Sequence, residues 1–210
     1  MVGDEFHKPT LFAGSTFEAF QGGDDPAQIS RLAHDTAAAL LSRVRADPDP
    51  GVIDRLIAYT DVNGIDAIAE LWSRASARSL PGALWRIYLL RALTRQDPVQ
   101  SSFVFQRGAD ISSTIDPVVA GAQAPTGPDE ITALADQILR GLFEGDFAVA
   151  LDRAAAFCRL MSTGCASLAD DAEQVSPTHA SELTTRALRF HSIAAELSAC
   201  ATLWRRDSLD

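Results

Sequence analysis

The sequence predicts an all-α protein of about six to seven helices, with an N-terminal helical set around a buried central helix and a C-terminal three-helix bundle. Apolar residues recur at intervals of three and four over most of the chain, which is the period of an amphipathic helix. Pro26, Pro128 and Pro177 each stand where such a repeat begins, and proline is favoured in the first helical turn. Between Ala83 and Leu93, apolar residues surround the whole helical circumference, as expected of a central helix.

Size and charge limit the class of protein. The chain has 210 residues, of which 47% are hydrophobic and 22% charged, enough to bury a substantial core. We divide it into an aromatic tail (1–25), an N-terminal helical half (26–108), a connector rich in proline, glycine and alanine (109–128) and a C-terminal helical bundle (129–210), which we expect to share one compact domain. The formal net charge of −10 argues against general affinity for nucleic acids or anionic membranes.

The cysteines and the basic residues indicate a bacterial cytoplasmic protein. Cys158, Cys165 and Cys200 form an odd set without CxxC spacing, each among apolar residues, so we expect reduced and buried thiols. Lys8 is the sole lysine among the 18 basic residues, an arginine bias typical of GC-rich genomes. The first residues lack the apolar core of a signal peptide, and no stretch reaches the length of a transmembrane helix. We therefore expect a soluble protein without membrane contact.

Two amphipathic helices and a helical hairpin make up the N-terminal half. The first helix begins at Asp25-Pro26 and ends at the proline-rich breaker at residues 47–50, and a shorter helix follows in the 50s. Residues 62–96 then form two helices about a turn at residues 79–82, the second being the central helix. The apolar residues that we assign to the first two helices are Ile29, Leu32, Ala33, Thr36, Ala37, Leu40, Leu41, Val44, Val52, Ile53, Leu56 and Ile57.

Arginines concentrate between residues 74 and 107, where six of them stand beside a single acidic residue. If the two helices of the hairpin pack antiparallel, Arg91 faces Glu70 and Arg95 faces Asp66, which gives these arginines a structural role. Arg86 has no partner in this arrangement, although a buried guanidinium requires one.

An arginine without a partner motivates an alternative hypothesis. In this hypothesis the protein is a helical bundle that binds a small molecule or a lipid between its two halves. The arginines would meet an anion and the aromatic rings would line the wall. The pocket residues of this hypothesis are Trp72, Trp85, Arg86, Tyr88 and Arg107. A third hypothesis, nucleic-acid binding, needs the arginines of residues 74–107 exposed and unpaired on one face. A helix-turn-helix over residues 63–88 is disfavoured because its second helix is too apolar for the major groove.

Two segments of low charge are candidates for binding a protein partner. The helical pattern breaks after residue 97, where residues 101–105 form a short strand or a last helical turn. The connector that follows is apolar and includes Val118 and Val119, and we expect it to lie over the surface. The aromatic tail holds four of the ten phenylalanines, Phe6, Phe12, Phe17 and Phe20. Such a tail either packs on the protein's own helices or docks on a partner, because free phenyl rings in water are unfavourable.

The C-terminal half carries the clearest helical signals. A helix begins at Pro128, a short turn at residues 144–146 forces an antiparallel return, and the next helix runs from Phe147 to about residue 168. Ser176 and Pro177 then start a long helix, residues 177–206, with a coiled-coil spacing of apolar residues. Packing within one three-helix bundle and a homodimer through this helix both explain that spacing. Its apolar positions are Leu183, Ala187, Phe190, Ala194, Leu197, Ala201 and Trp204.

Motifs that carry chemistry are missing from the sequence. No glutamate precedes a histidine by three residues, and HExxH, zinc-ligand, P-loop, dinucleotide-binding and GxSxG patterns are absent. We assign no catalytic, cofactor-binding or metal-binding residue, expect no cofactor, and find no motif typical of a known family. The leading hypothesis is a non-enzymatic protein-interaction or regulatory module with an unknown partner, and the ligand-binding bundle described above is the alternative.

Overall fold

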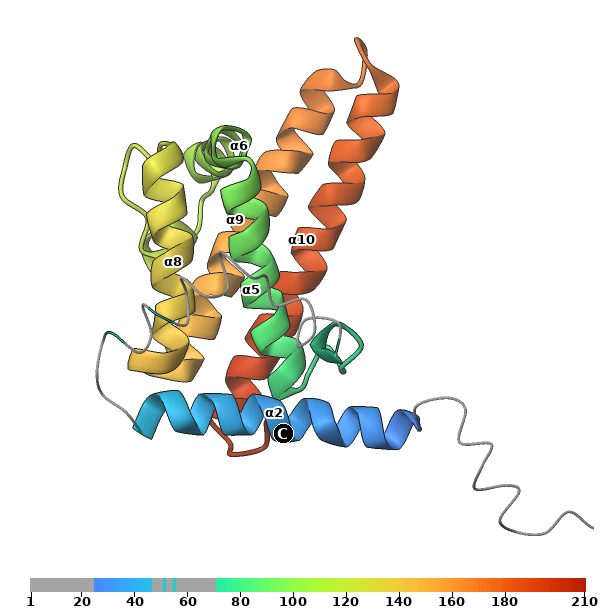
Figure 1. Ribbon diagram of the computed structural model, residues 1–210. Coiled ribbons are helices and arrows are strands. Elements are labelled where there is room, and N and C mark those ends of the chain that lie inside the picture. Colours follow the sequence, from blue (N-terminus) through green and yellow to red (C-terminus); the bar gives the residue numbers. More distant parts are fainter. Residues whose placement is uncertain (1–24, 47–50, 52–54, 56–70) are drawn as a thin grey trace, which may run out of the picture.

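The computed structural model describes residues 25–46, 51, 55 and 71–210, and in these residues it is all-α, as predicted (Figure 1). No residue of the described part lies in a strand. No helix in the same part combines the length and apolarity needed to cross a membrane. The helices are α2 (Pro26–Ala46), α5 (Leu80–Gln96), α6 (Pro98–Ile111), α7 (Asp116–Ala120), α8 (Pro128–Glu144), α9 (Phe147–Ala172) and α10 (Pro177–Trp204).

Helices α9 and α10 form a long antiparallel hairpin, and α9 is the helix on which most others pack. It contacts α6, α7 and α8 as well as α10, and its core side is rich in alanine, which lets these helices approach closely. The hydroxyl of Ser162 even reaches the Ala187 carbonyl oxygen of α10, at 2.8 Å. The apolar face predicted for residues 177–206 is buried against α9 of the same chain. A homodimer through α10 would therefore have to use the opposite face of the helix.

A helix occupies residues 98–111, so the alternative of a strand at residues 101–105 is wrong. Asp97 caps this helix, α6, by accepting a hydrogen bond from the Gln100 amide at 3.0 Å. Helix α6 crosses α9 where Gly108 lies against Leu160 and Gly164 lies against Val104, with backbone touching backbone. The buried side of α6 also carries Ser101 and Ser102. Small and polar residues at this contact explain why an apolar stripe did not reveal the helix.

The predicted central helix, α5, lies among α2, α8 and α10, and α2 runs across their lower ends (Figure 1). Arg45, near the end of α2, binds α2 to the end of α8. Its guanidinium donates two hydrogen bonds to the Leu142 carbonyl oxygen, at 2.8 and 3.1 Å, and one to that of Gly145, at 2.8 Å. These are carbonyls at the end of α8, where a positive charge is favourable. The same guanidinium lies 5.8 and 5.9 Å from the ring centres of Phe147 and Trp204.

Candidate functional site

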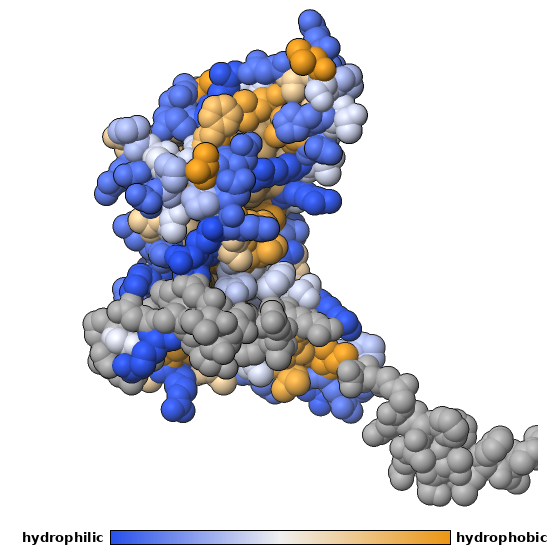
Figure 2. Space-filling view, turned by 45° about the horizontal axis from the view of Figure 1, so that its top comes forward, coloured by the Kyte–Doolittle hydropathy of each residue, from blue (hydrophilic) through white to orange (hydrophobic). Residues whose placement is uncertain are grey.

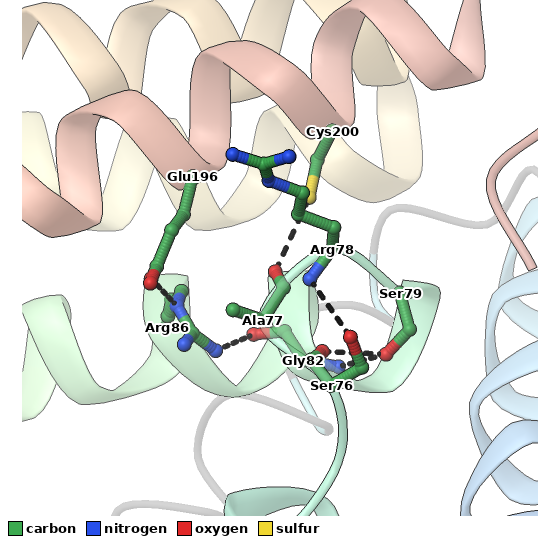
Figure 3. A network of polar contacts seen from close by, with 8 residues as sticks. All are labelled: Ser76, Ala77, Arg78, Ser79, Gly82, Arg86, Glu196 and Cys200. Atoms are coloured by element: carbon green, nitrogen blue, oxygen red, sulfur yellow. Dashed lines mark hydrogen bonds and ion pairs between the residues drawn. The ribbon is translucent and has the colours of Figure 1, made fainter.

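The start of α5 is tied to α10 by a network of polar contacts (Figure 3). Ser79 caps the helix: its hydroxyl accepts from the Gly82 amide at 3.3 Å and donates to the Ser76 carbonyl oxygen at 2.7 Å. Two turns after Ser79, Arg86 donates from Nε to the Glu196 carboxylate of α10 at 2.5 Å and from Nη1 to the Gly82 carbonyl oxygen at 3.0 Å. Arg86 therefore has a carboxylate partner, so the observation that favoured a ligand pocket no longer holds.

The five residues of the hypothetical pocket take part in separate contacts. Trp72 is buried, and its indole donates to the Thr36 hydroxyl of α2 at 3.1 Å. Trp85 and Tyr88 are neighbours on α5, with ring centres 6.1 Å apart. Arg107 points from α6 to the last turns of α9, where it binds Ser167 and Asp171, each at 2.9 Å.

Arg91 and Arg95 share one carboxylate of α8, that of Asp136, at 2.7 and 3.2 Å. The partners predicted for them, Glu70 and Asp66, lie outside the described residues. Together with Arg86 and Arg107, four of the six clustered arginines bind a carboxylate. These four are therefore not the exposed, unpaired arginines that the nucleic-acid hypothesis needs.

The cysteines are free and buried, and burial removes their reactivity. Desolvation raises the pKa of the Cys158 thiol to about 12 and that of Cys200 to about 11. It raises the pKa of Cys165 as well. Since the thiolate is the nucleophile and the metal-binding form, none of these thiols is poised for catalysis. Within the described residues, histidine, cysteine and acidic side chains nowhere gather in groups of three that could hold a metal ion.

The connector contains a short helix, α7, which is anchored on α9. Asp116 in its first turn accepts a hydrogen bond from Nε of Arg159 of α9 at 2.8 Å, and Nη2 of the same guanidinium lies 2.7 Å from the same carboxylate oxygen as an ion pair. At the other end, Arg153 of α9 donates to the Ala120 carbonyl oxygen at 3.2 Å. The connector thus lies over α9 with both ends of α7 bound. This helix was not predicted from the sequence, although Asp116-Pro117 repeats the pattern of an acidic residue before proline that starts α2.

Three branched apolar side chains of this region are exposed to solvent. Ile115 is 73% exposed and Val118 80%, while Ile111 at the end of α6 is half exposed. Of the two valines predicted to bind a partner, Val118 faces solvent and Val119 packs against the core. Exposed apolar side chains also occur outside this region, among them Val99 and Phe103 of α6, and the face in Figure 2 shows hydrophobic areas bordered by hydrophilic ones. Phe6, Phe12, Phe17 and Phe20, the other predicted contact residues, lie outside the described residues.

The negative charge of Asp116 binds α7 to Arg159 of α9, and protonation of this carboxylate at low pH should weaken the contact. Burial alone would raise the pKa of Asp116, but hydrogen bonds from Arg159 and Thr114 and the charge of Arg159 outweigh burial and lower it. A carboxyl with a lowered pKa stabilises the folded state above its unfolded pKa, and this contribution is lost as pH falls through the folded value. We expect Asp116→Asn to cost about 1–2 kcal/mol near pH 7, and this cost to shrink progressively as pH falls below about 4, the ordinary pKa of an aspartate. Urea unfolding of both proteins across this pH range measures the difference, and a constant cost at all pH values would contradict it.

Comparison with known proteins adds no further constraint, since no protein-family model, curated protein or solved structure matches this chain.

Proposed function

We propose that this chain is a protein-interaction module without catalytic activity of its own, and that α7 together with Ile111 forms its binding surface. We also place it in a reducing compartment such as the bacterial cytoplasm, because its three cysteines are unpaired and buried. The observation that carries the proposal is the exposure of Ile115, the N-cap residue of α7, and of Val118 within α7, while both ends of this helix are bound to α9.

Anchoring matters because a rigid surface loses little conformational entropy when a partner binds. A five-residue helix has no stability of its own, so its shape comes from the contacts of Asp116 and Ala120 with α9. These contacts hold two large apolar side chains in solvent, where they contribute no stability to the isolated protein. Residues 111–127 contain one charged side chain, Asp116, and Arg159 neutralises it. The surface therefore suits a protein partner whose contact region is itself apolar and uncharged.

The double variant Ile115→Ser, Val118→Ser should bind the partner about 10- to 100-fold more weakly, as expected when two central apolar contacts are lost. Its melting temperature should stay close to that of the wild type, because both side chains are already exposed. A photo-cross-linking residue at position 118, in cells that naturally make the protein, identifies the partner, and titration with the purified partner then gives the affinities.

Val175→Ser is the matched control, because Val175 is 87% exposed in the turn between α9 and α10, far along the chain from α7. Equal binding by the double variant and the wild type would reject α7 as the binding surface. Equal weakening by the control would mean that the affinity reflects general surface hydrophobicity.

A further inference from the structure

A hollow of about 320 Å³ lies between the first half of α2 and residues 71–76. In Figure 1 this half of α2 runs out past α5, with the segment that leads into α5 beside it. Two contacts hold this segment in place. The buried Trp72 indole donates to the Thr36 hydroxyl of α2 at 3.1 Å, and the Ser76 carbonyl oxygen accepts from the Ser79 hydroxyl at 2.7 Å. A ligand would therefore enter a hollow whose two walls are already ordered, which lowers the entropic cost of binding.

The lining of this hollow combines apolar side chains with polar groups. The apolar lining residues are Pro26, Ile29, Ala33, Leu71 and Ala75, and the polar ones are Ser30, Arg74 and Ser76. Ala33 is buried, and Ile29 and Leu71 are half-buried. Arg74 and both serines are exposed, so the polar groups lie toward the solvent. Among the described residues that line the hollow, Arg74 alone carries a charge.

Volume and lining together define the chemistry of a suitable ligand. An apolar cavity of about 150 Å³ holds one benzene molecule, so this hollow has room for about twelve non-hydrogen atoms. An apolar body would cover Ile29 and Leu71 and remove their surface from water. The Arg74 guanidinium has five N–H donors, so it can bind a carboxylate in addition to the interaction that it already makes. The hydroxyls of Ser30 and Ser76 can donate to the same group.

We propose that this hollow binds a small amphipathic carboxylate of about ten to twelve non-hydrogen atoms. Its apolar body lies on Ile29 and Leu71, and its carboxylate binds Arg74. The site shares no residue with the pocket predicted from the sequence, although Leu71 directly precedes Trp72. It involves neither α6 nor α7, so it is independent of the binding surface proposed above.

The test uses 4-phenylbutanoate, a carboxylate of the required size, and its uncharged analogue 4-phenyl-1-butanol. Both are titrated into the isotopically labelled full chain while amide chemical shifts are followed. We expect 4-phenylbutanoate to shift the signals of residues 29–33 and 71–76, with a Kd of about 0.1–5 mM. Arg74→Gln should weaken its binding about three- to tenfold and leave the binding of the alcohol unchanged, because the alcohol carries no charge. Ile29→Ser should weaken the binding of both, because both lose an apolar contact.

Arg189→Gln is the matched control, because it removes the same charge from an exposed position on α10 and should leave both affinities unchanged. Equal binding of 4-phenylbutanoate by Arg74→Gln and the wild type would overturn the proposal, since the carboxylate would then not be recognised. Shifts confined to residues 111–119 would overturn it too, because the ligand would then bind the exposed apolar side chains near α7. So would the absence of any shift at about 20 mM, well above the expected Kd. The purified chain suffices for this experiment, so its failure is distinguishable from a failure of the binding surface on α7.

Discussion

Gly164→Ala should destabilise the protein by about 2–4 kcal/mol, which is a large effect for the addition of one methyl group. The new Cβ would overlap the carbonyl oxygen of Val104 and lie 2.9 Å from its carbonyl carbon and 3.1 Å from the Gly108 nitrogen. All of these atoms belong to the backbone of α6, which cannot rotate aside as a side chain can, so the two helices must separate. Alanine gains up to about 1 kcal/mol over glycine in helix propensity, which offsets only part of this cost.

Urea unfolding of Gly164→Ala and of Gly145→Ala measures the effect against a matched control. At Gly145 the backbone is extended, and a Cβ would meet only the Gly141 carbonyl oxygen at an ordinary 3.5 Å. We expect this control to change stability by no more than about 0.5 kcal/mol. Gly108→Ala should resemble Gly164→Ala, and the double variant should cost less than the sum because both substitutions push apart the same helices. A fully stable Gly164→Ala would show that α6 does not cross α9 there.

Helices with a large apolar stripe and a proline start were predictable from the sequence, and α6 was not. Pro26, Pro128 and Pro177 mark the first residues of α2, α8 and α10, as expected. In α6 the pattern is mixed, because Gly108 and two serines face the core beside Val104 and Phe105, while Val99 and Phe103 are exposed. The period of apolar residues cannot locate a helix whose buried side mixes apolar side chains with glycine and serine and whose exposed side also carries apolar residues.

Ion-pair partners depend on the tertiary arrangement, which the sequence does not reveal locally. The hairpin hypothesis paired arginines with Glu70 and Asp66, which lie outside the described residues. Within the described residues, Arg86 pairs with Glu196, 110 residues away, and Arg91 with Asp136, 45 residues away. Only one of the two exposed residues of the proposed binding surface was predicted from the sequence, for a similar reason. Low charge in the connector pointed to Val118, but Ile115 joins it only because α7 is a helix docked on α9.

Asp136→Ala should cost about 2–4 kcal/mol, the second large effect, because it removes the carboxylate that two arginines of α5 share. The Arg91 side chain is 3% exposed, so its guanidinium has lost most of its water, and Asp136 at 2.7 Å offsets that loss. Arg95, which is 39% exposed, binds the same carboxylate at 3.2 Å and is already in contact with water, so it loses less when the carboxylate is removed. Most of the cost therefore comes from Arg91. Asp136→Asn should fall between the wild type and Asp136→Ala, because the amide keeps one acceptor oxygen but no charge.

Asp152→Ala is the control, since its partner Arg205 is 49% exposed and Asp152 itself 36%. Pairs of such exposure contribute about 0–1 kcal/mol, and salt screens them. Urea unfolding in 0.05 and 0.5 M NaCl should therefore give a cost for Asp136→Ala that barely changes with salt, while the small cost for Asp152→Ala disappears. Equal costs for the two substitutions would mean that Asp136 does not compensate the burial of the Arg91 guanidinium in solution. In that case the contact between α5 and α8 depends on apolar packing alone.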